Sequence, residues 1–283
     1  MAQILNGKEV SDKIVRDLRT RSIALGKKGV IPILAIVRIG RNPDDLAYER
    51  SIEKIATESR IYIRQFAFED TITTEEMAAE IEELNRNKMI SGMLIFRPLP
   101  KHIDERKICN LIPAAKDVDG VTDGSAAYVY TGEGEGFVPC TAEACIEMLK
   151  YYKIPLEGKN AVVIGRSQVI GKPVSMLLLK ENATVTICHS RTKDLEKICS
   201  DKDIIIAAAG CAGIVSEGCF NENQTVLDVA INFDSEGNMC GDVDLEAAKE
   251  KVYAVTPVPG GIGSVTTAIL MRHIVEAAEK SCK

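Results

Sequence analysis

The feature that most constrains the fold of this chain is an alternation of short apolar runs with amphipathic segments of helical length. Nearly continuous apolar runs are typical of strands that are buried on both faces of a parallel sheet. In the first half we expect strands at 32–40, 61–68 and 92–96, and helices at 9–25, 44–59 and 74–87. The order strand, helix, strand indicates right-handed crossover units and an α/β fold.

The second half repeats this alternation after a glycine-rich loop, Thr131–Phe137, which marks a domain boundary. We expect strands at 160–165, 183–188, 203–210, 225–231 and 251–256, and helices at 142–152, 173–180 and 264–278. This series predicts a Rossmann-like, doubly wound parallel sheet. A length of 283 residues is sufficient for two domains, each with its own core.

Composition excludes several classes of protein. The chain has 35 basic and 41 acidic residues, a formal net charge of −6, which disfavours nucleic acid as a partner. No apolar run approaches the length of a membrane span, and no signal sequence opens the chain, so we expect a cytoplasmic protein without membrane contact. The nine cysteines form no Cys-x-x-Cys pair and only three histidines accompany them, so we expect reduced thiols and no metal site.

The segment 162–173, VVIGRSQVIGKP, places glycines at both ends of a turn between a strand and a helix. Gly165 allows a sharp turn, and Gly171 allows backbone amides to approach a pyrophosphate. The spacing differs from G-x-G-x-x-G, so a turn without a ligand stays an equal alternative on these residues alone.

The end of the next strand distinguishes between the two nicotinamide cofactors. An acidic residue there favours NAD, because it accepts a hydrogen bond from the ribose 2′-hydroxyl. Here the strand ends in His189-Ser190-Arg191-Thr192, without a carboxylate. Arg191 and Arg166 are suited to a phosphate and Ser190 adds a hydroxyl, so NADP is favoured and NAD stays possible. The alternative is that both arginines are solvated loop residues.

Several motifs in fixed order make the chain resemble the methylenetetrahydrofolate dehydrogenase/cyclohydrolase family. They are KDVDG (116–120), PCT (139–141), the 162–173 turn, ATVTICHSRT (183–192), DIIIAAAG (203–210), VLDVAIN (226–232), GDVD (241–244) and TPVPGGIG (256–263). The resemblance implies a folate-binding domain of residues 1–138 plus 265–283, a Rossmann-like domain of residues 139–264, a cleft between them, and a homodimer.

The resemblance also implies roles for single residues. Tyr48 corresponds to the tyrosine that lies against the folate ring, and Asp119 to the carboxylate that holds the pterin. Both roles fit the chemistry, since a flat ring suits an aromatic platform and paired donors suit a carboxylate. Without the resemblance they are a core tyrosine and a turn aspartate. The other matching positions are Pro259, Gly260 and Gly261 for folate, and Gly165, Arg166, Ser167, Ser190 and Ile231, to which we add Arg191, for the nucleotide.

The chain departs from the family at the lysine that drives the cyclohydrolase step. That position, four residues after Tyr48, holds Ile52. Lys54 lies two places further, and at about 100° per residue it is about 240° around the helix from Tyr48, whereas Ile52 is only about 40° away. Lys54 therefore points to another face.

A second departure supports the first. The family's glutamine that pairs with this lysine is replaced by Phe96, and loss of both partners leaves no polar group unsatisfied. The oxidation of methylenetetrahydrofolate needs alignment and a cofactor, whereas hydrolysis of the methenyl product needs proton transfers. We therefore expect an oxidoreductase of one-carbon metabolism whose cyclohydrolase activity is weak or absent. The neighbouring Arg97 is interpreted as a solvated residue, or as a contact for the folate tail.

Other functions stay open at this point. The protein could be an ordinary bifunctional enzyme that uses another lysine, such as Lys54 or Lys101. It could be a regulatory protein that binds folate and nucleotide without catalysis, although that class need not retain both ligand sites. A hydroxy-acid dehydrogenase would need a general base near the nicotinamide, and neither His189 nor His273 is obviously placed for that role.

Overall fold

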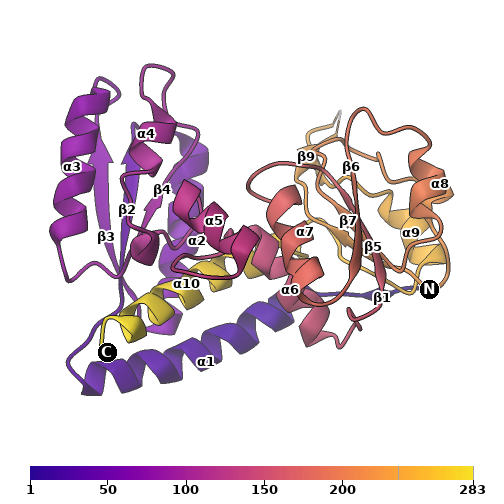
Figure 1. Ribbon diagram of the computed structural model, residues 1–283, viewed down its shortest axis with the longest axis horizontal. Helices are drawn as coiled ribbons and strands as arrows, with labels where there is room; N and C mark the ends of the chain where they lie inside the picture. Colours follow the sequence, from indigo (N-terminus) through magenta and orange to yellow (C-terminus); the bar gives the residue numbers. More distant parts are fainter. Residues whose placement is uncertain (235, 283) are drawn as a thin grey trace. The chain divides into compact units, whose positions relative to one another are not determined.

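A computed structural model describes residues 1–234 and 236–282, and the chain divides into two compact units (Figure 1). The three-stranded unit comprises residues 13–140 and 267–283, and the six-stranded unit comprises residues 1–12 and 141–266. The division falls within the helices α1 (Gly7–Lys27) and α10 (Gly263–Lys280). Residues 1–12 lie in the six-stranded unit and not with residues 13–140, because β1 (Gln3–Ile4) pairs in parallel with β11 (Ala254–Val255).

The three-stranded unit contains a parallel sheet in the order β3-β2-β4. Its strands are β2 (Ile33–Ile39), β3 (Tyr62–Phe68) and β4 (Gly92–Ile95). The helices that connect or follow them are α2 (Pro43–Ser59), α3 (Thr74–Arg86), α4 (Glu105–Cys109) and α5 (Asp123–Thr131), with a 3-10 turn at Ala114–Lys116. All three strands lie within the segments that the apolar runs predict.

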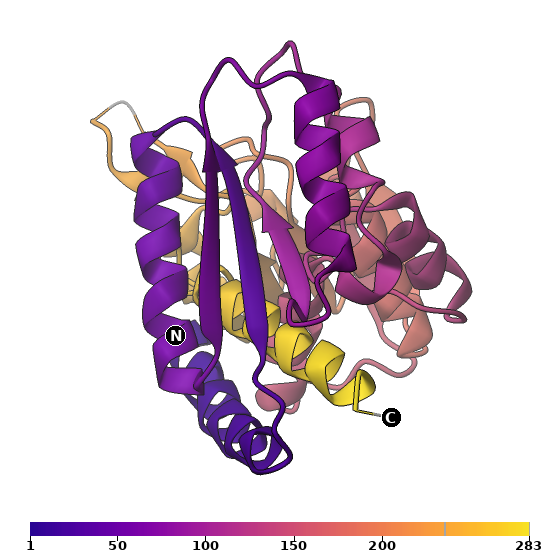
Figure 2. The same cartoon turned by 90° about the vertical axis from the view of Figure 1, so that its left-hand side faces the viewer.

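Helices cover both faces of this sheet (Figures 1 and 2). On one face Ala35, Val37 and Met93 join a core with residues of α3 and α4. On the opposite face a side chain at Gly92 would run into Val118 and into Ile274 of α10, so α10 passes close to β4 there. The carboxyl end of β4 lies between these two layers. Phe96 and Arg97 follow directly after it and belong to the site described below.

The six-stranded unit is a parallel sheet in the order β1-β11-β8-β7-β5-β6. Besides β1 and β11, its strands are β5 (Asn160–Ile164), β6 (Thr184–Cys188), β7 (Ile204–Ala207) and β8 (Thr225–Asp228). Its helices are α6 (Cys140–Tyr151), α7 (Gly171–Lys180), α8 (Leu195–Cys199) and α9 (Leu245–Lys251), with a 3-10 turn at Glu217–Cys219. A short antiparallel pair, β9 (Asn232–Phe233) and β10 (Met239–Cys240), lies outside the main sheet. The predicted α/β fold with a Rossmann-like parallel sheet is confirmed.

The structure corrects several element boundaries. The predicted strand 203–210 ends at Ala207, because the amides of Ala209 and Gly210 bond to the side chain of Asp242. The predicted strand 225–231 ends at Asp228. Helices α4, α5, α8 and α9 were not predicted, since all four are too short to show a helical period.

Two further findings concern the described residues. Within 1–234 and 236–282, no helix is long and apolar enough to cross a membrane. Among the same residues no disulfide is formed, and six of the nine cysteines are buried, while Cys211 and Cys282 are exposed.

Candidate functional site

The first group of predicted site residues lies on α2. This helix begins after Asn42, whose side chain accepts a hydrogen bond from the Asp44 amide, and Pro43 fits its first turn. Ile52 is completely buried, whereas Lys54 is exposed. Tyr48 lies beside the buried face with 39% of its surface exposed, as expected for a ring available to a ligand.

Phe96 lies directly after β4 and brings a second ring to Tyr48. Its amide donates to the carbonyl of Val37, so the backbone continues the line of the strand by one residue. Phe96 is buried, and its ring centroid is 5.6 Å from that of Tyr48 at an interplanar angle of 33°. This separation is within the range of favourable aromatic pairs.

Asp119 forms an ion pair with Arg97, with 3.5 Å between Oδ2 and the guanidinium. Arg97 also lies 3.9 Å from Glu105, whose other oxygen accepts a hydrogen bond from the Leu99 amide at 2.8 Å. Arg97 is therefore not simply a solvated residue, because it pairs with two carboxylates, one of them that of Asp119. No sequence pattern links Arg97 to Asp119, since 22 residues separate the two partners.

The surroundings of Asp119 affect its charge. Burial raises the pKa of the carboxyl to about 6, although Arg97 and His273 oppose that shift. Burial, together with the nearby carboxylate of Asp119, raises the pKa of the Tyr48 phenol, while a side-chain hydrogen bond with Thr267 opposes it. Tyr48 therefore stays neutral, and Asp119 can exist in either form near neutral pH.

Cys140 and His273 form a buried pair behind Asp119. Nδ1 of His273 donates to the carbonyl of Val118 at 2.7 Å, and the thiol of Cys140 donates to the same carbonyl at 3.4 Å. The ring of Phe137 lies 4.8 Å from the imidazole. Cys140 belongs to the PCT motif, but no role for its thiol follows from the sequence, and a lone histidine within a helix carries no distinguishing signal.

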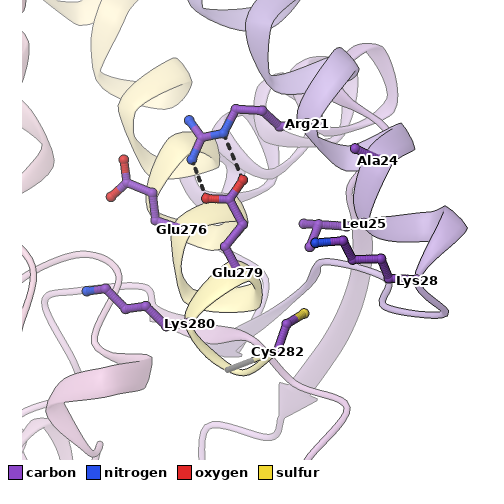
Figure 3. A pocket seen from close by; sticks show the side chains of 8 residues that line it. All are labelled: Arg21, Ala24, Leu25, Lys28, Glu276, Glu279, Lys280 and Cys282. Carbon is purple, nitrogen blue, oxygen red and sulfur yellow. Dashed lines mark hydrogen bonds and ion pairs between the residues drawn. The ribbon is translucent and has the colours of Figure 1, made fainter.

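A separate cavity of about 520 Å³ lies between α1 and α10 (Figure 3). Arg21 and Glu279 form a bidentate ion pair across it, with distances of 3.0 and 2.7 Å. The remaining residues that line it are Ala24, Leu25, Lys28, Glu276, Lys280 and Cys282. None of the predicted site residues is among them.

The turn between β5 and α7 has the close packing expected of a nucleotide loop. Gly165 has a φ of +134°, and a side chain there would run into the carbonyl of Ala208. A side chain at Gly171 would likewise run into the backbone of Gly165 and Arg166. The hydroxyl of Ser167 accepts hydrogen bonds from the amides of Ile170 and Gly171 at 3.1 and 3.3 Å, so it also caps α7.

The other predicted nucleotide residues follow neighbouring strands at the same edge. The strand order reverses at β5, which lies between β7 and β6, and in such sheets ligands bind outside the carboxyl ends at this point. Ser190 and Arg191 follow β6 and are exposed, as is Arg166 after β5. Ile231 follows β8 with 58% of its surface exposed. No cluster of His, Cys, Asp or Glu that could hold a metal ion occurs in the part of the chain that the structure describes.

Pro259, Gly260 and Gly261 form a turn in the six-stranded unit, and so belong to a different unit from Tyr48 and Asp119. The carbonyl of Gly260 accepts a hydrogen bond from the Gly7 amide at 2.9 Å. Gly260 has a φ of +99°, which favours glycine. The turn is thus fixed against the start of α1, with Pro259 and Gly260 exposed.

Comparisons with known proteins identify the family to which the chain belongs. Residues 5–119 match the family model "Tetrahydrofolate dehydrogenase/cyclohydrolase, catalytic domain", and residues 139–282 match its "NAD(P)-binding domain". A Clostridium botulinum protein named "Bifunctional protein FolD" is 50% identical over 281 residues, which are 99% of this chain and 100% of that protein.

Solved structures lead to the same family. The bifunctional FolD methylenetetrahydrofolate dehydrogenase/cyclohydrolase of Campylobacter jejuni has a TM-score of 0.96, with 38% identity and 99% of each chain covered. The Trypanosoma brucei FolD, solved with NADP and an inhibitor, has a TM-score of 0.92 and 30% identity, with 99% or more of each chain covered. The chain therefore belongs to the tetrahydrofolate dehydrogenase/cyclohydrolase family and contains both its catalytic and its NAD(P)-binding domain.

Proposed function

We propose that this protein oxidises methylenetetrahydrofolate to methenyltetrahydrofolate with NADP as acceptor, and that it has lost most or all of the cyclohydrolase activity. The observation that carries the proposal is the apolar pair at the cyclohydrolase positions. Ile52 is completely buried, and Phe96 is buried against the ring of Tyr48. A site of this character suits a reaction that needs alignment without a protein base.

The residues of the three-stranded unit would bind and orient the folate. Tyr48 offers an exposed ring beside Phe96 for the flat heteroaromatic system. Asp119, held by Arg97, would accept the paired donors of the amino-pyrimidinone edge. In the six-stranded unit, Pro259, Gly260 and Gly261 are the other positions that the family uses for folate, and their backbone would approach a ligand closely.

The six-stranded unit fits a nicotinamide dinucleotide. Gly165 and Gly171 have no side chains, so a ligand could approach the backbone of the turn after β5 closely. The hydroxyl of Ser167 accepts hydrogen bonds from the amides of Ile170 and Gly171 at the start of α7. Arg166, Ser190 and Arg191 offer donors for the 2′-phosphate, and residues 189–192, directly after β6, include no carboxylate that would favour NAD. Ile231 adds an exposed apolar surface for a ring. When bound, NADP supplies the acceptor for the hydride.

The cyclohydrolase step requires an attacking water and proton transfers, for which a lysine at position 52 would serve. An ammonium group cannot be replaced by an isoleucine in that role. Lys54 and Lys101 are both exposed, and Lys54 leaves α2 on another face than Ile52. Neither lysine has a feature that favours it as a substitute.

The rival function is a bifunctional enzyme. This rival is favoured by the name of a relative that is 50% identical to this chain, "Bifunctional protein FolD". The two hypotheses differ in one half-reaction only, so a single assay separates them.

The test supplies each half-reaction separately to the purified protein. Methylenetetrahydrofolate with NADP, and in parallel with NAD, should give reduced nucleotide, with NADP preferred. Methenyltetrahydrofolate alone should lose its absorbance no faster than in buffer. Enzyme-dependent hydrolysis well above that rate would establish the bifunctional alternative, and absence of nucleotide reduction with folate binding intact would favour a regulatory protein.

We also propose a homodimer in the cytoplasm, as the resemblance to the family implies. Sedimentation of the purified protein tests the dimer, and a single species at the monomer mass would refute it.

A further inference from the structure

Asp242 has no part in the functions assigned above, yet its carboxylate accepts four hydrogen bonds. It is completely buried. It accepts hydrogen bonds from the amides of Ala209, Gly210 and Cys211 at 2.6, 3.0 and 2.7 Å. It also accepts one from the side-chain amide of Asn232 at 3.0 Å. Four donors on one buried carboxylate hold two separate segments together.

These segments both lie at the edge where the nucleotide is expected. Residues 208–211 follow β7, and Asn232 comes directly after Ile231, which follows β8. The first segment also contacts the nucleotide turn itself, since the carbonyl of Ala208 occupies the space that a side chain at Gly165 would need. Displacement of residues 208–211 would therefore disturb that turn.

Asp242 is itself fixed by a second buried carboxylate. Asp228, at the end of β8, accepts hydrogen bonds from the amides of Asp242 and Val243, both at 3.0 Å. A side chain at Gly241 would run into Asp228, so the approach requires glycine there. Asp228 thus anchors the backbone of residues 241–243 to the sheet. From this anchored backbone, the side chain of Asp242 bonds to residues 209–211.

We propose that Asp242 is a positioning residue that holds residues 208–211 and Asn232 in the conformation that receives the nicotinamide half of the dinucleotide. The proposal rests on the proposed use of NADP. In a doubly wound sheet the adenosine half lies on the β6 side of the reversal point, where Ser190 and Arg191 are found. The segments held by Asp242 follow β7 and β8, on the other side.

This division of the site gives a sharp test with two probes. Asp242→Asn replaces one acceptor oxygen with a donor, so at least one amide loses its partner. The dissociation constant of the variant for NADP should rise by about tenfold or more, whereas that for adenosine 2′,5′-bisphosphate, which represents the adenosine half alone, should change by less than about twofold. The KM for the folate substrate should also stay within about twofold.

The matched control is Asp244→Asn, two residues further in the same motif. Asp244 caps α9 by accepting from the Ala247 amide at 3.1 Å, and it does not bond to residues 208–211. A loss of NADP affinity in this variant equal to that of Asp242→Asn would overturn the proposal. An unchanged NADP affinity in Asp242→Asn, or an equal loss for both probes, would overturn it as well.

A second measurement does not depend on ligand binding. Hydrogen exchange should be faster in Asp242→Asn than in the unaltered protein at one or more of the amides of Ala209, Gly210 and Cys211, since at least one of them loses its acceptor. If Asp242→Asn does not fold, Asn232→Ala removes only one of the four hydrogen bonds and should weaken NADP binding alone. Failure of the unaltered protein to bind NADP would instead refute the proposed function.

Discussion

The ring of Phe96 lies 5.6 Å from the ring of Tyr48, at an interplanar angle of 33°. Phe96 is buried and Tyr48 is partly exposed, so one ring supports the other from the protein side.

On the proposal that positions 52 and 96 have lost the cyclohydrolase pair, Ile52→Lys with Phe96→Gln should produce more cyclohydrolase activity than Ile52→Lys alone. Ile52→Lys alone places an ammonium in a fully buried position without its partner, which should lower the free energy of unfolding by several kcal/mol, about 3 or more. Ile52→Lys with Phe96→Gln supplies an acceptor, so the double variant should be the more stable and should gain hydrolysis of methenyltetrahydrofolate.

Thermal unfolding and methenyltetrahydrofolate absorbance measure the two effects. Lys54→Met is the matched control, because it removes the nearest alternative lysine from an exposed position. A loss of hydrolysis in that control would show that Lys54 carries a cyclohydrolase activity.

Substrate binding should depend on the ionisation of Asp119. The pKa of this carboxyl is about 6, and only the ionised form can accept both donors of the pterin edge. The kcat/KM for methylenetetrahydrofolate should therefore fall as the pH drops below about 6. Arg97 lowers this pKa, so Arg97→Leu should move the acidic limb of the profile to higher pH.

The pH profile of kcat/KM checks this in both proteins. Arg106→Leu is the control, since Arg106 is exposed and pairs with Asp123 rather than Asp119. Superimposable profiles for Arg97→Leu and the unaltered protein would contradict the assignment.

The raised pKa of Asp119 also affects stability. The folded state binds the proton more tightly than the unfolded state, whose carboxyl has a pKa near 3.8. The protonated form therefore favours folding, and that contribution is lost as the pH rises from about 4 through 6. Asp119→Asn cannot ionise, so its melting temperature relative to that of the unaltered protein should increase between pH 4.5 and 7.5.

Thermal melts over this pH range measure the difference. A constant difference between the two proteins would be inconsistent with a raised pKa. The same variant should lose folate binding at every pH, which would make Asp119 a residue retained for function at some cost in stability.

The choice between NADP and NAD should depend on Arg191. Arg191→Ser should raise the KM for NADP by about tenfold and leave the KM for NAD within about twofold, because only the former carries a 2′-phosphate. Steady-state kinetics with both nucleotides measure the ratio. Lys193→Ser alters an exposed cation in the same segment and should change neither KM. Equal effects of the two substitutions would mean that general charge, rather than a specific contact, governs binding.

The fold class and the order of the main elements could be predicted from the sequence. Apolar runs of strand length, such as the one within 160–164, alternate with amphipathic segments of helical length, and both signals are local. That Ile52 and Lys54 lie on different faces of α2 was also predictable, because helical geometry separates the two positions without knowledge of any contact. Short helices such as Leu195–Cys199 were not visible, since they complete too few turns to show a period.

Only the tertiary structure decided which charges meet. Arg97 and Asp119 are distant in sequence and no pattern links them, yet they form an ion pair beside Tyr48. The same holds for Asp242, whose four donors come from segments that precede it by up to 33 residues. The physical reason is that periodicity records burial on one face of an element, whereas hydrogen bonds and ion pairs depend on where separate strands end in space.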